Sequence, residues 1–200
     1  MSALTRTSRR AVLLTAPALA AALTLTACSS GGTSGGGGDT NFVTGKNGIA
    51  TVAKDKRATA PVLSGKTIEG EQLSTADYKG KILVVNVWGS WCSPCRAEAP
   101  NLQKVYADLK DQGVQFVGIN TRDTNTTSAL NFEKQFGVTY PSLYDPTGKQ
   151  MLRFKKGTLN PQLIPSTLVI DRDGKIASRA LQALGEDTLL GMIKPVLAEK

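Results

Sequence analysis

Two of the chain's three cysteines stand two residues apart, within the segment VVNVWGSWCSPCRAEAP at residues 84–100. Residues 81–88 form an almost continuous apolar run rich in β-branched residues, which predicts a central strand covered on both faces. From Ser93 onward apolar residues recur at helical spacing, and Gly113 supplies the stop. Cys92 and Cys95 are therefore expected where a buried strand meets the first turn of a helix, and any fold for this chain must accommodate that junction.

The rest of the chain predicts an α/β architecture. A second buried strand after the first helix would complete a βαβ unit with a parallel pair, and an Asp-Gly turn indicates an antiparallel hairpin later on. A helix capped by Asn125 or Thr126 should end at Gly137. Pro100 and Pro195 should bend the helices that contain them. The remaining predicted elements are strands at 114–120, 140–144, 166–170 and 175–179 and a last helix at 186–197. We expect a mixed sheet flanked by helices.

The first residues have the layout of an export signal. Arg6, Arg9 and Arg10 precede an uncharged stretch of Ala, Leu, Val and Thr at residues 11–27, which is too short and too rich in Ala and Thr for a convincing membrane span. The arginine pair resembles a twin-arginine signal, although such pairs are common in ordinary signals. The choice between the two export routes stays open.

The third cysteine follows this stretch directly. Leu25-Thr26-Ala27-Cys28 resembles the lipobox of bacterial lipoproteins, in which the cysteine becomes the lipidated first residue; an ordinary cleavage site with an accidental cysteine is the alternative. The Gly/Ser-rich stretch that follows predicts a flexible tether. The predicted organisation is a signal peptide at 1–27, a lipidated Cys28 with its tether at 28–45, and one folded domain at 46–200.

Charge and composition exclude several kinds of function. Removal of residues 1–27 takes away three arginines and no acids, which lowers the formal net charge from +8 to +5. The lysines are scattered, so we expect no nucleic-acid site. The chain contains no histidine. That absence argues against a structural zinc site, a c-type haem attachment, which needs His after the second Cys, and a Cys-His or Ser-His catalytic site.

A disulfide, structural or redox-active, remains for the cysteine pair. Bridges are common in exported proteins, but one that closes so short a loop removes little unfolded-state entropy. At the start of a helix, free backbone N–H groups and the helix dipole stabilise a thiolate. We therefore expect Cys92 to be the nucleophile and Cys95, one turn later, to resolve the mixed disulfide. No cofactor beyond this redox-active pair is expected.

The segment from Trp88 to Arg96, WGSWCSPCR, resembles the active site of thioredoxin-fold proteins, and specifically of the exported TlpA/ResA-like branch. Ile164-Pro165 resembles the second hallmark of that fold, a cis-proline that faces the cysteines. The resemblance covers roughly residues 58–197 and implies a thioredoxin-like domain. It also implies that Ile164 and Pro165 contact an extended substrate. Without it, Pro165 would be an ordinary loop or edge-strand proline. Peroxiredoxins share the fold, but their peroxidatic cysteine has a different sequence context.

Residues beside the pair gain roles from the same resemblance. Glu98 lies on the same side of the helix as Cys95, and taken alone it would be a solvated glutamate. In ResA-like proteins a glutamate at this spacing is buried and takes part in proton transfer, a role that a desolvated carboxyl group could perform here. Apart from the resemblance, Trp91 could belong to the core, but its place beside the nucleophile favours an apolar collar for substrate. Arg96 could stabilise the thiolate electrostatically or face solvent, and we expect it to face solvent.

The predicted function is that of a membrane-tethered thiol-disulfide oxidoreductase on the extracytoplasmic face of the bacterial membrane. The resemblance implies a reductant of exported proteins, including apocytochrome c, that receives electrons from a membrane CcdA-like protein. The same machinery could act as an oxidant, because direction depends on potential and partners. A lipid-anchored binding module with a structural bridge is the alternative from another class. Oligomeric state is not predicted.

Overall fold

The computed structural model describes residues 40–199. The predicted signal peptide, Cys28 and most of the predicted tether lie outside this range. The domain contains nine strands and three α-helices among its described residues, with short 3₁₀ turns between them. In chain order these are β1 (Val43–Thr44), β2 (Ile49–Thr51), β3 (Ser64–Lys66), β4 (Gln72–Ser74), β5 (Ile82–Trp88), α1 (Ser93–Leu109), β6 (Val114–Thr121), α2 (Thr126–Phe136), β7 (Ser142–Asp145), β8 (Ser166–Ile170), β9 (Ile176–Ala180) and α3 (Glu186–Leu197).

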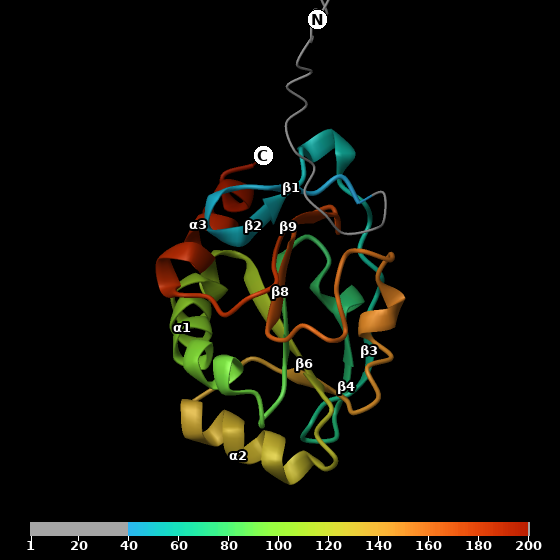
Figure 1. Cartoon of the computed structure of the whole chain (residues 1–200), viewed down its shortest axis with the longest axis vertical. Helices are drawn as coiled ribbons and strands as arrows, with labels where there is room; N and C mark the ends of the chain where they lie inside the picture. The colour runs from blue at the N-terminus through green and yellow to red at the C-terminus, as the bar shows by residue number, and fades with distance from the viewer. Residues whose placement is uncertain (1–39, 200) are drawn as a thin grey trace, which may run out of the picture. The chain divides into compact units, whose positions relative to one another are not determined.

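Seven strands form one mixed sheet in the order β1-β2-β9-β8-β5-β6-β7, and β3 and β4 form a separate hairpin. β5, β6 and β7 are parallel to one another, whereas β8 runs antiparallel to β5 and β9 antiparallel to β8. In Figure 1 helices α1 and α3 lie on one side of the sheet, and β3 and β4 lie on the other. Within the large sheet, the parallel strands β5, β6 and β7 meet the antiparallel β8–β9 hairpin at β5, which pairs with both β6 and β8.

Strand β5 is buried along its whole length. Its side chains alternate between two cores: Ile82 and Val84 join residues of α1 and α3, whereas Leu83 and Val85 join a cluster on the opposite face. This double burial explains why the sequence is apolar without alternation. The strand ends at Trp88, so the next few residues lie at the carboxyl end of this central strand, where α1 begins.

Most predicted elements are confirmed, and several boundaries agree to the residue. Asn125 caps α2, Gly137 ends it in a left-handed conformation, and the hairpin turns at Gly174. The strand predicted at 140–144 lies at Ser142–Asp145. α1 and α3 each continue as one helix through Pro100 and Pro195, so neither proline ends its helix. The sequence did not reveal β1, β2 or the β3–β4 hairpin, and the sheet already begins at Val43, ahead of the boundary expected at residue 46.

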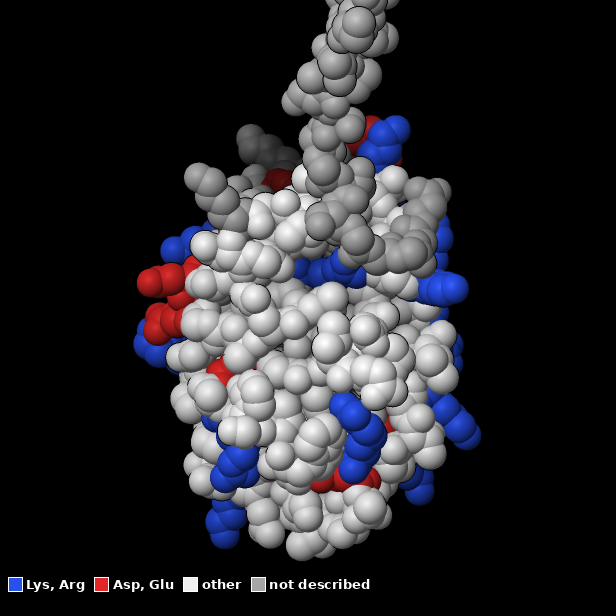
Figure 2. All heavy atoms as spheres, viewed as in Figure 1, with Lys and Arg blue, Asp and Glu red and all other residues white. Residues whose placement is uncertain are grey.

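Charged side chains on the surface are dispersed. Figure 2 shows lysine and arginine side chains at separate places on the displayed face, around a broad uncharged area. This distribution agrees with the expectation of scattered lysines. Within residues 40–199, no helix combines the length and the apolar character needed to cross a bilayer.

Candidate active site

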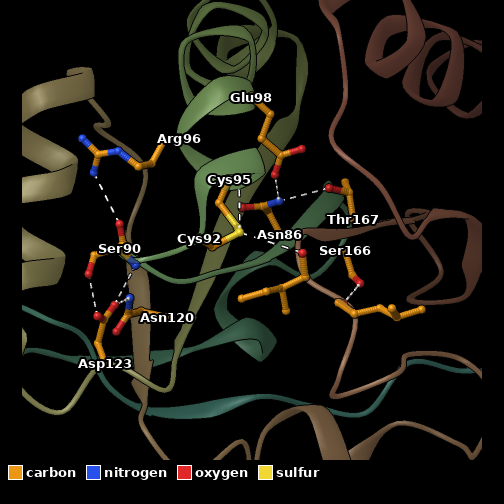
Figure 3. Close-up of a disulfide and its surroundings, with 12 residues drawn as sticks. Asn86, Ser90, Cys92, Cys95, Arg96, Glu98, Asn120, Asp123, Ser166 and Thr167 are labelled. Carbon is orange, nitrogen blue, oxygen red and sulfur yellow. Dashed lines mark hydrogen bonds between the residues drawn. A yellow bond between two sulfur atoms is a disulfide. The ribbon is translucent and has the colours of Figure 1, made fainter.

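The cysteine pair forms a disulfide at the junction of β5 and α1. Cys92 precedes the helix and Cys95 lies in its first turn, with an S–S distance of 2.03 Å and a Cα–Cα distance of 5.2 Å. Figure 3 shows the bridge between the start of α1 and the chain that leads into β8. The side chains are nearly covered in this oxidised state, since Cys92 is 4% and Cys95 1% exposed. The structure thus confirms the pairing and its expected position.

Cys92 occupies the N-cap of α1. The backbone N–H of Cys95 donates a hydrogen bond to Cys92 Sγ at an N···S distance of 3.2 Å. On reduction, this donor and the positive end of the helix dipole would stabilise a thiolate on Cys92 in preference to Cys95. The two sulfurs are therefore inequivalent, and the local geometry favours Cys92 as the attacking group.

Ile164 and Pro165 face the disulfide, as the resemblance implied. Their peptide bond is cis, and the carbonyl oxygen of Ile164 lies 3.8 Å from Cys92 Sγ. Ile164 also packs at the edge of the apolar cluster that contains both cysteines. An extended substrate that reached Cys92 would meet this backbone at the same time.

Glu98 is buried, so its interpretation as a solvated residue is wrong. Its side chain, 1% exposed, accepts hydrogen bonds from Asn86 Nδ2 at 2.8 Å and from the backbone N–H of Leu184 at 2.9 Å. Burial raises the pKa of Glu98 to about 7, and the hydrogen bonds from Asn86 and Leu184 oppose that rise. The carboxyl group can therefore gain or lose a proton near neutral pH, one helical turn beyond Cys95 (Figure 3).

Asn86 and Thr167, neither of which was expected at the site from the sequence, orient this carboxyl group. Asn86 stands opposite Thr167 in the β5–β8 register, and its amide also donates to Thr167 Oγ1 at 3.1 Å. Both residues are fully or almost fully buried. A polar residue inside the apolar run of β5 was the signal for Asn86, because a buried amide needs polar partners.

A second polar cluster fixes the loop that precedes Cys92. The carboxylate of Asp123 accepts hydrogen bonds from the backbone N–H of Ser90 at 2.9 Å, from Ser90 Oγ at 2.5 Å and from Asn120 Nδ2 at 2.6 Å. Asp123 is 4% exposed. Figure 3 shows it pointing toward Ser90 and Asn120. These bonds connect the turn after β6 to the active-site loop. No local sequence pattern predicted this contact, because Asp123 and Ser90 are 33 residues apart.

Arg96 and Trp91 flank the loop in different ways. Arg96 is half-buried rather than free in solvent: its guanidinium donates to Ser90 O and Gln135 Oε1 and lies 5.1 Å from the centre of the Phe136 ring. Trp91, by contrast, is 52% exposed beside the buried Cys92. This exposure excludes a place for Trp91 in the core and suits the collar predicted from its position beside the nucleophile.

Trp88 packs in the same apolar cluster as the two cysteines and is linked through Ser142 to a second buried carboxyl group, that of Glu133. Its ring stacks on Phe132 at 4.3 Å, and its indole N–H donates to Ser142 Oγ, which in turn donates to Glu133. Gly118 leaves room for this chain, because a Cβ there would lie 2.2 Å from Ser142 Oγ. Burial raises the pKa of Glu133 to about 8. Because Trp88 and both cysteines belong to one apolar cluster, this hydrogen-bond network fixes a side chain of the cluster that surrounds the disulfide.

The arrangement suits thiol-disulfide exchange. It combines a disulfide with inequivalent sulfurs, a backbone that faces the nucleophile and a carboxyl group that titrates near neutrality. Within residues 40–199, no cluster of acidic, Cys or His side chains could hold a metal ion.

Known proteins with related sequences are thiol-disulfide oxidoreductases. Residues 57–179 match the AhpC/TSA family. The thiol-disulfide oxidoreductase ResA of Geobacillus kaustophilus (strain HTA426) is 31% identical over 137 residues, which cover 68% of this chain and 72% of the relative. ResA of Bacillus subtilis (strain 168) is 30% identical over 139 residues, which cover 68% of this chain and 74% of the relative.

Solved structures support the same relationship. A DsbF homologue from Corynebacterium diphtheriae superposes with a TM-score of 0.70 at 35% identity, covering 76% of this chain and 96% of that one. A secreted thiol-disulfide isomerase from Corynebacterium glutamicum gives a TM-score of 0.72 at 28% identity, covering 82% of this chain and 100% of that one. The thioredoxin-like fold expected from the sequence is confirmed. The chain belongs to the AhpC/TSA family, and within it to the ResA-like thiol-disulfide oxidoreductases.

Proposed function

We propose that this oxidoreductase acts outside the cytoplasm, tethered to the membrane by lipid on Cys28, and that it reduces disulfides in exported proteins. Apocytochrome c is a candidate substrate, and a membrane CcdA-like protein is the candidate electron donor. The relatives named ResA and the structural neighbour described as secreted support this setting. The lipobox-like segment and the Gly/Ser-rich stretch after it supply the tether.

The observation that carries the proposed exchange mechanism is the buried carboxyl group of Glu98 one turn beyond Cys95. In the reductive direction the Cys92 thiolate attacks a substrate disulfide, forms a mixed disulfide and expels one substrate thiolate. Cys95 then loses its proton and attacks Cys92 Sγ, which closes the Cys92–Cys95 bridge and releases the second substrate thiolate. Glu98 can take up the proton that Cys95 must lose. The substrate disulfide gains two electrons, and the protein dithiol loses them.

A second candidate is an oxidant or isomerase for exported proteins. The hydrogen bond from Cys95 N–H to Cys92 Sγ favours it, because stabilising the thiolate stabilises the reduced form and makes the disulfide more oxidising. The neighbours described as a DsbF homologue and a thiol-disulfide isomerase also support it. The two candidates differ in their reduction potential.

The reduction potential of the Cys92–Cys95 couple tests the direction. The purified protein is equilibrated with dithiothreitol and glutathione buffers, and the fraction of reduced pair is measured after acid quenching and alkylation. We expect a value near that of thioredoxin, roughly −270 mV, which suits a reductant supplied with electrons from the membrane. A value near that of DsbA, roughly −120 mV, would contradict the reductive role and favour the oxidant.

A further inference from the structure

A cation and an exposed indole lie together on the rim of the active site. Trp91 follows the fixed loop and precedes Cys92, and its side chain is 52% exposed although Cys92 is 4% exposed. The guanidinium carbon of Arg122 lies 4.7 Å from the centre of the Trp91 ring. Arg122 is itself exposed. A substrate chain that approaches Cys92 from this side would meet both groups.

The position of this pair is tightly defined by its surroundings. The indole lies over Gly89, where a Cβ would come within 2.8 Å of Trp91 Nε1. Arg122 has a φ of 58°, in the left-handed region that is unfavourable for a non-glycine residue. The next residue, Asp123, binds both the backbone and the hydroxyl of Ser90. The turn that carries Arg122 is thus held to the loop that carries Trp91, which explains how the unfavourable backbone persists.

Arg122 presents its charge without an acidic partner. Within residues 40–199, no carboxylate forms an ion pair with it. The nearest acid in sequence, Asp123, is buried and already accepts three hydrogen bonds. Glu98 is 1% exposed, and its carboxyl group is bound by Asn86 and by the backbone of Leu184. The guanidinium of Arg96, unlike that of Arg122, donates to two protein oxygens. The Arg122 guanidinium therefore keeps donors available for a carboxylate that arrives with the substrate.

We propose that Arg122, stacked on Trp91, is a specificity-determining residue that favours polypeptide substrates with Asp or Glu beside the reacting cysteine. Arg122 would bind the substrate carboxylate while the backbone of Ile164, whose carbonyl oxygen lies 3.8 Å from Cys92 Sγ, meets the substrate chain. The effect belongs to formation of the mixed disulfide, because resolution by Cys95 takes place within the protein. This inference depends on exchange with protein substrates, and it adds the chemical character of the sequence that is preferred.

The test compares three synthetic peptides with the reduced protein. Each peptide carries one cysteine blocked as a mixed disulfide with the neutral thiol 2-mercaptoethanol, and Glu, Gln or Lys stands on both sides of that cysteine. The second-order rate constant for exchange is measured by stopped flow at low salt and again in 0.5 M NaCl. For an exposed charge pair we expect the Glu peptide to react about threefold faster than the Gln peptide, and the Lys peptide to be slowest. High salt should reduce these ratios.

Three variants assign the preference to one side chain. Arg122→Gln should bring the Glu-to-Gln ratio close to one, and Arg122→Glu should make the Lys peptide the fastest. Lys110→Gln removes the same charge at the C-cap of α1 and should keep the wild-type ratio. At ~1.5 Å per helical residue, that position is about 27 Å from Cys92. Each ratio is measured within one variant, so a general loss of rate does not affect it.

Two results would overturn the proposal: equal rates for the three peptides in the wild-type protein, or the wild-type order of rates retained in both Arg122 variants. A wild-type protein that exchanges with none of the peptides would instead contradict the proposed exchange with protein substrates, and the preference would fall with it. The two kinds of failure are distinguishable, because only the first leaves exchange with the Gln peptide intact.

Discussion

Cys95→Ala should accumulate covalent adducts with disulfide-bearing substrates, and Cys92→Ala should not. In the first variant Cys92 still attacks, but the thiol that would release the substrate is gone. In the second, the remaining Cys95 is 1% exposed and lacks the N-cap position that stabilises a thiolate on Cys92. We expect at least about tenfold more mixed disulfide with Cys95→Ala, because the thiolate is the reactive form.

Mixed disulfides are quantified by mass spectrometry after acid quenching of each reduced variant with an oxidised model peptide. A variant that lacks both cysteines gives the background, and Cys28 is replaced by alanine throughout so that only the pair can react. Similar trapping by the two single variants would show that Cys92 is not the preferred nucleophile. More adduct with Cys92→Ala would reverse the assigned order of attack.

Glu98→Gln should change both the pH dependence of stability and that of exchange. The folded-state pKa of Glu98, about 7, is above its ordinary value of 4.5, so the folded protein retains a proton that the unfolded chain loses. The resulting stability is fully present below pH 4.5 and is lost as the pH rises through 7. At 1.36 kcal/mol per pKa unit, this group lowers the free energy of unfolding by about 3 kcal/mol over that interval. Glu98→Gln should remove this decline.

The same substitution should slow resolution of the mixed disulfide. Without a group that accepts the proton of Cys95, we expect resolution at pH 7 to be about 100-fold slower and its inflection near pH 7 to disappear. Single-turnover kinetics between pH 5 and 9 measure both, and urea unfolding over the same range measures stability.

Glu133→Gln is the matched comparison for Glu98→Gln. Burial raises the pKa of Glu133 to about 8. Its contribution to stability therefore also declines as the pH rises, but the decline extends to about pH 8 instead of pH 7. Glu133 contacts Ser142 rather than the residues around Glu98, and its loss should leave the inflection of the resolution rate near pH 7. If both variants lost that inflection, or neither did, Glu98 would not be the group that accepts the proton.

The parts of the fold that the sequence predicted depend on local signals. β5 has an unbroken apolar run, Asn125 and Gly137 mark the ends of α2, and Asp-Gly marks the hairpin turn. β2 could not be found in this way, because a three-residue strand is defined by its pairing with β9, about 130 residues later in the chain.

In the site, too, the features with a local sequence signal were predicted, and those that depend on residues far away in the chain were not. The position of the cysteine pair followed from spacing, and Pro165 gained its meaning from a resemblance. Whether Glu98 is solvated or buried depends on Leu184, a partner 86 residues away. The link between Asp123 and Ser90 spans 33 residues and has no local signature. Asn86 was visible as a polar residue in an apolar strand, but its partner Thr167 lies on β8, 81 residues later in the chain.

The most direct test of the central claim is whether the Cys92–Cys95 bridge opens in the folded protein. Oxidised protein carrying Cys28→Ala is treated with reduced thioredoxin under native conditions and alkylated, and labelled cysteines are counted while circular dichroism monitors the fold. We expect both cysteines to become labelled without loss of native structure, as an active-site disulfide requires. A bridge that stays closed until the protein is denatured would contradict the redox role and leave a structural disulfide in a binding module.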